Sequence, residues 1–184
     1  MENNLTWKKG VFKSSYQIFS GETPVGKLKP DTWSRQGIGE LNGKKYLFET
    51  KGFFNQETVI YNPDTNLQTG KVTYSTWKTK ATIEYGGKTF SWKYDNTWNT
   101  KWSITDSATL LVRYHGSFTK GEIEISSYIE LLILTGLIIT NYFWQISSVV
   151  TFTAFLPVFI TIFKWITRII LIIISSWLFT FGIT

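Results

Sequence analysis

Apolar and polar residues alternate along the first two-thirds of the chain. Between residues 1 and 126, Trp, Tyr, Phe, Thr, Val and Ile alternate with Lys, Glu and Ser, and a helical period of 3.6 residues is absent. Alternation of this kind is typical of strands that bury one face and expose the other. This region is therefore predicted to be mainly β.

Turn signals separate the alternating runs at short, regular intervals. Asn42-Gly43 and Gly86-Gly87 are the strongest, because a type I′ turn requires positive φ at both central residues. With the other signals they predict about a dozen short strands in an antiparallel meander. The full set is Ser20-Gly21-Glu22, Leu41-Asn42-Gly43-Lys44, Asn62-Pro63-Asp64, Tyr85-Gly86-Gly87-Lys88, Asp106-Ser107 and Lys120-Gly121.

The β region contains an internal repeat with a period of 44 residues. The motif Gly26-Lys27-Leu28 recurs as Gly70-Lys71-Val72, and Gly43 to Phe48 recurs as Gly87 to Trp92. A third, shorter copy is expected to begin near Ile104. No copy can bury its apolar face alone, so the copies are predicted to close into one barrel or sandwich.

Aromatic residues also recur at this period, and two interpretations of them remain open. They are expected to pack in the core of the domain, and the alternative is an aromatic cage for a ligand. The residues concerned are Trp33, Trp77, Tyr46, Phe90, Phe48 and Trp92.

Charge divides the chain into two parts. All thirteen acidic residues lie at or before Glu130, and of the nineteen basic residues only Lys164 and Arg168 follow it. The net charge of +6 is compatible with an anionic lipid surface or with simple solubility. It falls short of the dense basic stripe of a nucleic-acid-binding protein, so no nucleic-acid partner is predicted.

The first apolar segment after the β region, residues 127–145, has two possible roles. Its apolar run from Leu131 to Tyr142 is short for a membrane span and is more typical of a buried helix. In one interpretation Tyr128 to Trp144 plugs the barrel, whose interior would bury every face of an apolar helix. In the other, the same residues form a first transmembrane helix.

Residues 146–184 are predicted to form a C-terminal membrane segment with transmembrane helices. The stretch from Trp144 to Phe163 has twenty residues without a charge, which is enough to cross ~30 Å of hydrocarbon. Lys164 and Arg168 are expected near an interface, and Pro157 is expected to kink the helix. The rest, Ile169 to Ile183, either returns across the bilayer or lies partly in it.

The predicted location is a membrane, with the N-terminal domain in the cytoplasm. The N-terminus lacks the apolar segment of a secretory signal. The positive-inside rule would place Lys164 and Arg168 in the cytoplasm as well, which requires two intervening helices rather than one. This conflict favours the transmembrane interpretation of residues 127–145.

Residues that could carry out catalysis are scarce. The chain has no cysteine, His115 is its single histidine, and neither a Gly-x-Ser-x-Gly nor a phosphate-binding Gly-x-x-x-x-Gly-Lys-Thr motif occurs. We therefore predict no catalytic residue, no metal site and no cofactor, and a function other than that of an enzyme.

Lysines that repeat with the 44-residue period are the candidate ligands for lipid headgroups. Lys27 and Lys71 are equivalent, as are Lys44 and Lys88, and other lysines lie close by. An alternative role for them is to keep strand edges soluble and unpaired. The candidates are Lys27, Lys29, Lys44, Lys45, Lys71, Lys78, Lys80 and Lys88.

These motifs resemble the tubby-like barrel superfamily, which includes tubby C-terminal domains, LURP-one-related proteins and phospholipid scramblases. The resemblance implies a barrel of twelve strands around one apolar C-terminal helix. Tubby domains also bind phosphoinositide headgroups, but the basic residues that bind them there do not map onto this chain residue by residue. The matching positions are Tyr16, Ile18, Gly21, Glu22, Val25, Gly26, Lys27, Gly43, Lys44, Tyr46, Phe48, Gly87, Lys88, Phe90, Trp92 and Lys93. They lie within residues 5 to 145.

Three functions are compatible with this organisation. The first is a non-enzymatic, membrane-anchored β-domain that contacts acidic phospholipid headgroups at the cytoplasmic leaflet. The second is a lipid-scrambling or transport protein, and the third is a membrane-tethered protein-interaction module. Membrane lipids are the expected partners, and the sequence identifies neither a particular lipid nor a protein partner.

Overall fold

A computed structural model describes residues 4–10, 15–30, 35–52, 56–76 and 79–180, with side chains described except at 147–154 and 177–180. It contains twelve β-strands followed by one helix, α1 (Glu130–Thr180). The strands are β1 (Asn4–Lys9), β2 (Tyr16–Ser20), β3 (Thr23–Pro30), β4 (Gln36–Leu41), β5 (Lys44–Lys51), β6 (Glu57–Tyr61), β7 (Gln68–Tyr74), β8 (Lys80–Tyr85), β9 (Lys88–Tyr94), β10 (Lys101–Asp106), β11 (Thr109–Gly116) and β12 (Lys120–Ile125).

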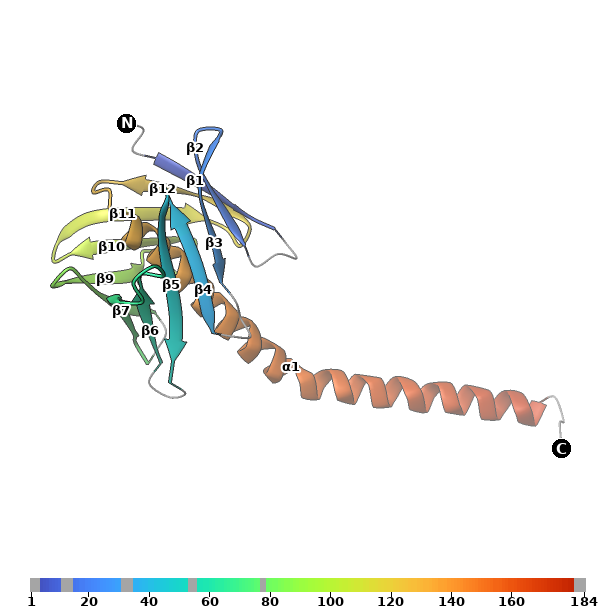
Figure 1. Cartoon of the computed structure of the whole chain (residues 1–184). Helices are drawn as coiled ribbons and strands as arrows, with labels where there is room; N and C mark the ends of the chain where they lie inside the picture. The colour runs from blue at the N-terminus through green and yellow to red at the C-terminus, as the bar shows by residue number, and fades with distance from the viewer. Residues whose placement is uncertain (1–3, 11–14, 31–34, 53–55, 77–78, 181–184) are drawn as a thin grey trace. The chain divides into compact units, whose positions relative to one another are not determined.

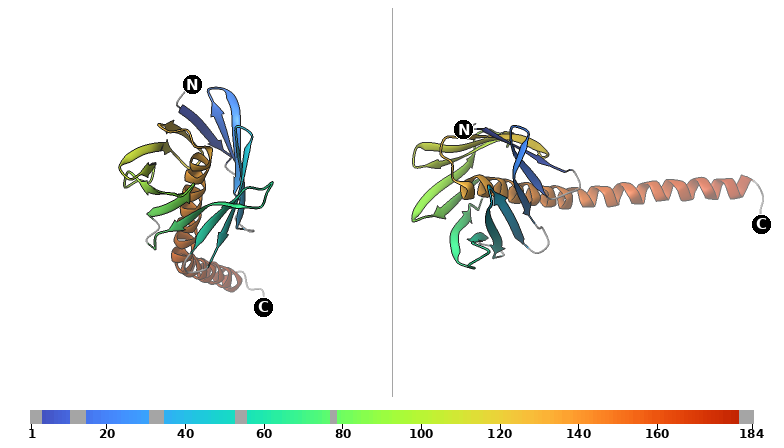
Figure 2. Two further views of the ribbon diagram at one scale, coloured as in Figure 1. Left: turned by 60° about the vertical axis from the view of Figure 1, so that its left-hand side comes forward. Right: turned by 45° about the horizontal axis from the view of Figure 1, so that its top comes forward.

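The strands form a closed up-and-down barrel (Figures 1 and 2). Every strand pairs antiparallel with the strand before it, and β12 returns to pair with β1. This last ladder runs from Asn4 opposite Glu124 to Lys8 opposite Lys120. Closure leaves no unpaired sheet edge. The predicted fold, a mainly β antiparallel meander that closes into a 12-stranded barrel, is thus confirmed.

The 44-residue repeat is preserved in the strand register. Gly26 lies opposite Leu41 between β3 and β4, and Gly70 lies opposite Tyr85 between β7 and β8. The strands β3–β6 thus correspond to β7–β10. Gly26 and Gly70 are required for close packing, since a Cβ at either position would lie 2.6 Å or 3.0 Å from the backbone carbonyl of Glu40 or Glu84.

Three equivalent β-bulges show that a third unit completes the barrel. The register shifts after Ile18 in β2, after Ile60 in β6 and after Ile104 in β10. The residues left unpaired on the facing strands are Val25, Thr69 and Leu111, each at the same place in its unit. The third unit therefore comprises β11 and β12 together with β1 and β2, so it is divided between the two ends of the β region.

The first part of α1 fills the interior of the barrel. Figure 2 shows the helix surrounded by the strands, and Leu131 to Leu134 are completely buried. Burial continues to Phe143, which is 2% exposed. Of the two interpretations of this segment, the barrel plug is the one that the structure adopts. An apolar helix of this kind is stable there because the inward faces of the strands enclose it on every side.

Large aromatic side chains fill the remaining interior. Four of the recurring aromatics, Tyr46, Phe48, Phe90 and Trp92, are at most 9% exposed. Their predicted role in core packing is confirmed. Trp33 and Trp77 lie outside the described residues.

Polar contacts at two points fix the plug along its length. The hydroxyl group of Tyr114 donates to the carbonyl of Ile133 at 3.0 Å, and Tyr114 fills the space beside Gly136. Further along, the amide oxygen of Asn141 accepts from Lys9 Nζ at 2.8 Å and from the Tyr16 hydroxyl at 3.2 Å. These contacts tie both halves of the plug to the wall of the barrel.

The chain consists of two compact units. The first is Met1–Phe143 and the second is Trp144–Thr184. The predicted boundary at residue 126 separated the barrel from its plug, whereas in the structure the plug belongs to the barrel unit. The physical reason is burial, since the inward strand faces and the helix enclose one shared core.

Candidate membrane-contacting site

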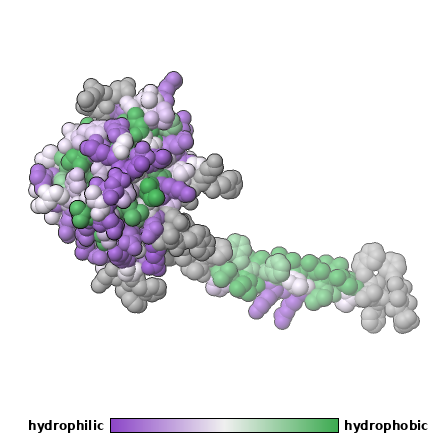
Figure 3. Space-filling view, in the orientation of Figure 1, coloured by the Kyte–Doolittle hydropathy of each residue, from purple (hydrophilic) through white to green (hydrophobic). Residues whose placement is uncertain are grey.

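The second part of α1 carries an extended apolar surface. Phe155–Ser176 has 22 residues with a mean hydropathy of 2.1, and none of its surface is buried (Figure 3). A helix of this length spans about 33 Å, slightly more than a hydrocarbon core. Among the described residues this is the stretch long and apolar enough to cross a membrane. Exposed apolar surface of this extent is characteristic of a membrane or protein contact.

Two charges lie at different places in the predicted span and in this stretch, whose first residue is also the first with a described side chain after residue 146. The expected uncharged span was Trp144–Phe163, with Lys164 and Arg168 beyond its end, but in Phe155–Ser176 both charges lie near the middle. Its fourteen Leu, Ile, Phe and Val residues contribute about −4 to −8 kcal/mol, and two central charges cost about +5 to +7 kcal/mol. The eleven such residues of Trp144–Phe163 contribute about −3 to −7 kcal/mol without that cost.

Four polar residues of this helix fall on one face. Thr161, Lys164, Arg168 and Ser175 recur at spacings of three, four and seven residues, which brings them within one narrow stripe. The hydroxyl group of Thr161 donates to the carbonyl of Pro157 at 2.9 Å, and that of Ser175 donates to the carbonyl of Ile172 at 2.9 Å. The hydroxyl groups of Thr161 and Ser175 are thus satisfied within the helix. The charged groups of Lys164 and Arg168 are the members of this stripe that most need water or lipid headgroups.

The four lysines that repeat along the barrel are paired with neighbouring carboxylates rather than gathered at one site. Lys27 and Lys71 lie on equivalent strands, but Lys27 pairs with a glutamate of the following strand and Lys71 with one of the preceding strand. The pairs are Lys27–Glu40 at 3.2 Å, Lys44–Glu130 at 3.0 Å, Lys71–Glu57 at 2.8 Å and Lys88–Asp106 at 4.0 Å. Local pairing reduces the net positive field that these lysines can offer to an anionic surface.

The other predicted lysines are dispersed over the wall. Lys29, Lys45 and Lys80 are exposed on β3, β5 and β8, respectively. Lys78 lies outside the described residues. The described members of the predicted set therefore do not form one cluster.

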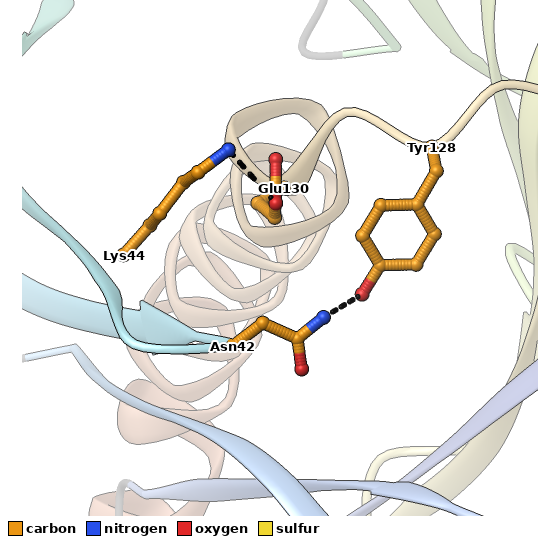
Figure 4. Close-up of polar contacts among 4 residues, drawn as sticks. All are labelled: Asn42, Lys44, Tyr128 and Glu130. Carbon is orange, nitrogen blue, oxygen red and sulfur yellow. Dashed lines mark hydrogen bonds and ion pairs between the residues drawn. The ribbon is translucent and has the colours of Figure 1, made fainter.

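Lys44 has a structural role at the start of the plug (Figure 4). Its ion pair with Glu130 joins the turn between β4 and β5 to the first turn of α1. Beside it, the amide nitrogen of Asn42 donates to the Tyr128 hydroxyl at 2.8 Å. A carboxylate at a helix N-terminus is also favoured by the helix dipole. This end of the barrel thus holds the beginning of the helix.

An open hollow on the outer wall collects cations that the repeat analysis missed. It has a volume of about 460 Å³ and crosses β9 to β12. Its basic side chains are Lys93, Lys101 and Arg113, and His115 is adjacent. Asp95 accepts the Ser103 hydroxyl at 2.9 Å, and Glu124 lies 3.5 Å from Arg113. The cross-strand pairing that gathers these residues is invisible in a linear sequence.

Lys9 is a second residue that sequence reasoning missed. It contacts Asn141 and lies over the Phe118 ring, 4.3 Å from its centroid. Burial lowers the pKa of the Lys9 ammonium group from 10.5 to about 8. Lys9 ends β1 and precedes Gly10, and nothing in this local sequence indicates that its ammonium group is partly buried.

Within the described residues, no three His, Asp or Glu side chains gather closely enough to hold a metal ion. His115 lies opposite Lys101 on one side and Glu122 on the other.

Comparisons of this chain with protein-family models, with curated proteins and with solved structures gave no match.

Proposed function

We propose that this protein is a membrane-anchored, non-enzymatic β-barrel module that contacts acidic phospholipid headgroups at the cytoplasmic leaflet. The observation that carries the proposal is the fully exposed apolar surface of Phe155–Ser176. Such a surface is unfavourable in water at roughly 25 cal/mol per Å². A lipid bilayer removes this penalty for the part of the helix that lies in hydrocarbon.

The outer wall of the barrel supports a contact with anionic headgroups. The hollow lined by Lys93, Lys101 and Arg113 brings three cations together around two hydroxyl-bearing residues, Ser103 and Thr105. Each cation close to an anionic leaflet contributes roughly 1 kcal/mol. Asp95 and Glu124 offset part of this charge and leave one net positive charge in the hollow when His115 is neutral.

The resemblance to the tubby-like superfamily supports the proposal in one respect. It implies twelve strands around one apolar helix, which is the architecture of this chain. Membership of that superfamily remains part of the proposal.

Anchoring is tested with the full-length protein in its host membrane. The wild type is expected to stay in the pellet after washing with alkaline carbonate and with high salt. A variant with Leu156→Asp and Ile160→Asp is expected to lose this retention, since each carboxylate placed in the hydrocarbon costs about 3 kcal/mol. Release of the wild type by high salt alone would show a peripheral attachment and contradict the proposal.

Headgroup contact is tested separately in neutral-lipid nanodiscs that contain the full-length protein. Titration with short-chain phosphatidic acid is expected to shift amide signals of the β10 and β11 strands. Arg113→Ala should weaken this response, whereas Lys27→Ala, which removes a cation of β3 outside the hollow, should not. Equal responses to phosphatidic acid and to phosphatidylcholine would contradict the headgroup part of the proposal.

Lipid scrambling is a second candidate, and the polar stripe of Thr161, Lys164, Arg168 and Ser175 favours it. Such a stripe could guide headgroups across the bilayer if the apolar helix spans it. Proteoliposomes with a fluorescent lipid, treated with a quencher that does not cross membranes, measure this activity. Loss of fluorescence limited to the outer leaflet, as in empty vesicles, would eliminate scrambling and leave the anchoring role.

A further inference from the structure

The up-and-down topology places the connections between strands on two opposite rims of the barrel. The turns β2–β3, β4–β5, β6–β7, β8–β9 and β10–β11 lie on the rim where α1 begins, as the contacts of Asn42 and Lys44 show. We call this the entry rim. The connections β1–β2, β3–β4, β5–β6, β7–β8, β9–β10 and β11–β12 lie on the other, which we call the exit rim.

The plug reaches the exit rim at its end. Asn141 contacts Lys9 at the end of β1, and the Tyr142 ring stacks on Tyr74 at the end of β7 with centroids 4.1 Å apart. Phe143 packs near Tyr94 at the end of β9. The chain therefore leaves the barrel through the exit rim and continues from there toward the apolar helix.

Exposed Trp and Phe side chains distinguish the exit rim, whereas the exposed aromatic residue described at the entry rim is Tyr128. Trp98 in the β9–β10 connection is 84% exposed, and Phe118 in the β11–β12 connection is 49% exposed. The entry-rim turns instead consist largely of small or polar residues such as Asn42-Gly43 and Gly86-Gly87. Exposed Trp and Phe carry a hydration penalty that water does not relieve.

The two rims also differ in charge. A basic residue borders each exit-rim connection, and acidic residues are prominent near the entry rim. The exit-rim cations are Lys9, Arg35, Lys51, Lys80, Lys101 and Lys120. The entry-rim acids are Glu22, Glu40, Asp64, Glu84, Asp106, Glu124 and Glu130. They lie among the basic residues Lys27, Lys44, Lys45, Lys71, Lys88 and Arg113, so acids exceed cations at this rim by one. The exit rim also carries Glu49, Glu57 and Asp95, of which Glu49 is paired with Lys51 at 3.0 Å.

Aromatic rings together with Lys and Arg form the composition that membrane proteins place at the interface between headgroups and hydrocarbon. The rings lie among the headgroups, and the cations face anionic lipid phosphates. Both kinds of side chain surround the point where the chain leaves the barrel. A lipid surface is the partner that matches this combination of position, aromatic content and charge.

We propose that the exit rim rests in the headgroup layer of the bilayer that α1 enters, with Trp98 and Phe118 inserted between headgroups. This inference depends on the proposed membrane anchoring. It also determines which residues cross the bilayer. The hydrocarbon then begins close to Trp144, because a span that began at Phe155 would leave about 18 Å of helix between the rim and the hydrocarbon.

The absence of cysteine makes a direct test possible. Single cysteines replace Trp98, Phe118, Leu67, Phe155 or Ile166 in the full-length protein, and each variant carries one environment-sensitive fluorophore. Leu67 is the matched control, since it is 66% exposed in the β6–β7 turn of the entry rim. The labelled proteins are reconstituted in vesicles whose lipids bear a nitroxide quencher either on the headgroup or deep in the acyl chain.

Headgroup nitroxides are expected to quench the labels at 98 and 118 and to leave the label at 67 unchanged. Acyl-chain nitroxides are expected to quench the label at 155 most strongly. If labels 98 and 118 behave like label 67 while 155 or 166 is quenched, the rim inference is wrong and the anchoring proposal stands. If neither 155 nor 166 is quenched, the anchoring proposal fails, and the inference fails with it.

Discussion

Tyr114 occupies the space that a side chain at residue 136 would need. Its hydroxyl group donates to the carbonyls of Leu132 and Ile133 at 3.1 Å and 3.0 Å, and a Cβ at Gly136 would overlap the phenol ring. Strand β11 and the plug can approach each other this closely because the helix carries a glycine at their crossing.

The first prediction concerns this crossing. Gly136→Ala should lower the free energy of unfolding by about 1–3 kcal/mol, because the ring of Tyr114 must move within a packed core. Tyr114→Phe should cost only about 1 kcal/mol, the value of one hydrogen bond. Urea denaturation of the full-length protein in detergent micelles measures both. A Gly136→Ala variant as stable as the wild type would contradict the packing described.

The repeat provides a matched pair for a second prediction. Gly26→Ala places a Cβ 2.6 Å from the Glu40 carbonyl oxygen, and Gly70→Ala places one 3.0 Å from that of Glu84. Both should destabilise the barrel by about 1–3 kcal/mol, with the larger loss at Gly26, because a backbone atom cannot move aside cheaply. The midpoints of urea unfolding report the order, and the reverse order would be inconsistent with the structure.

A third prediction compares two ion pairs. Glu130 is 16% exposed at the side chain and begins α1, whereas Glu40 is 27% exposed and joins two strands. Glu130→Gln should destabilise the fold by about 1 kcal/mol, and Glu40→Gln by less, since exposed pairs contribute little and the helix dipole acts only on Glu130. Denaturation at low and high salt measures the difference, which should shrink at high salt. Identical losses of stability in the two variants would contradict the larger contribution expected of the ion pair at Glu130.

A fourth prediction concerns pH. The pKa of Lys9 is about 8 in the fold and near 10.5 in the unfolded chain, so between these values the unfolded state binds more protons. Stability should therefore rise from pH 8 toward pH 10. Above pH 10 the buried tyrosines oppose this trend, because burial raises their pKa values, that of Tyr46 to about 12. Urea midpoints in this range measure the slope.

The control for the pH effect is Lys9→Met. This variant keeps most of the side-chain volume and removes the titrating group, so the rise between pH 8 and 10 should disappear while the decline above pH 10 remains. An unchanged rise in the variant would assign the effect to another residue.

A fifth prediction follows from the position of the span. If hydrocarbon begins near Trp144, Leu156 lies close to the bilayer centre and Ile166 lies beyond the opposite edge. Leu156→Arg should then disfavour insertion by about 3 kcal/mol, and Ile166→Arg by much less. Glycosylation-based insertion assays on the full chain compare the two. A larger effect at Ile166 would instead support Phe155–Ser176 as the segment that crosses.

Local signals were sufficient to predict much of the barrel. Asn42-Gly43 and Gly86-Gly87 have positive φ in the structure, as their turn type requires. The repeat of Gly26 and Gly70 correctly indicated equivalent strands, because each glycine meets a steric demand from the carbonyl of Glu40 or Glu84 on the next strand of the same unit. The third unit was seen only in part, since β1 and β2 complete it from the other end of the β region.

Long-range electrostatics could not be predicted in the same way. Lys44 was expected to contact lipid, but its partner, Glu130, lies 86 residues away in sequence. The hollow around Arg113 depends on four strands and their register. Alternation of residues reveals which face of a strand a lysine occupies, whereas its neighbour across the ladder is fixed only by how the whole sheet closes.

The ladder between β1 and β12 also sets the order in which this molecule can fold during synthesis. Asn4 meets Glu124 only after more than a hundred residues have been made, so one edge of β1 must wait for its partner while β2 can already pair with the other edge. The barrel wall and its interior helix are then completed almost together, just before the most apolar part of the chain emerges. A slow final closure that depends on the C-terminal strands is the kinetic behaviour that this topology imposes.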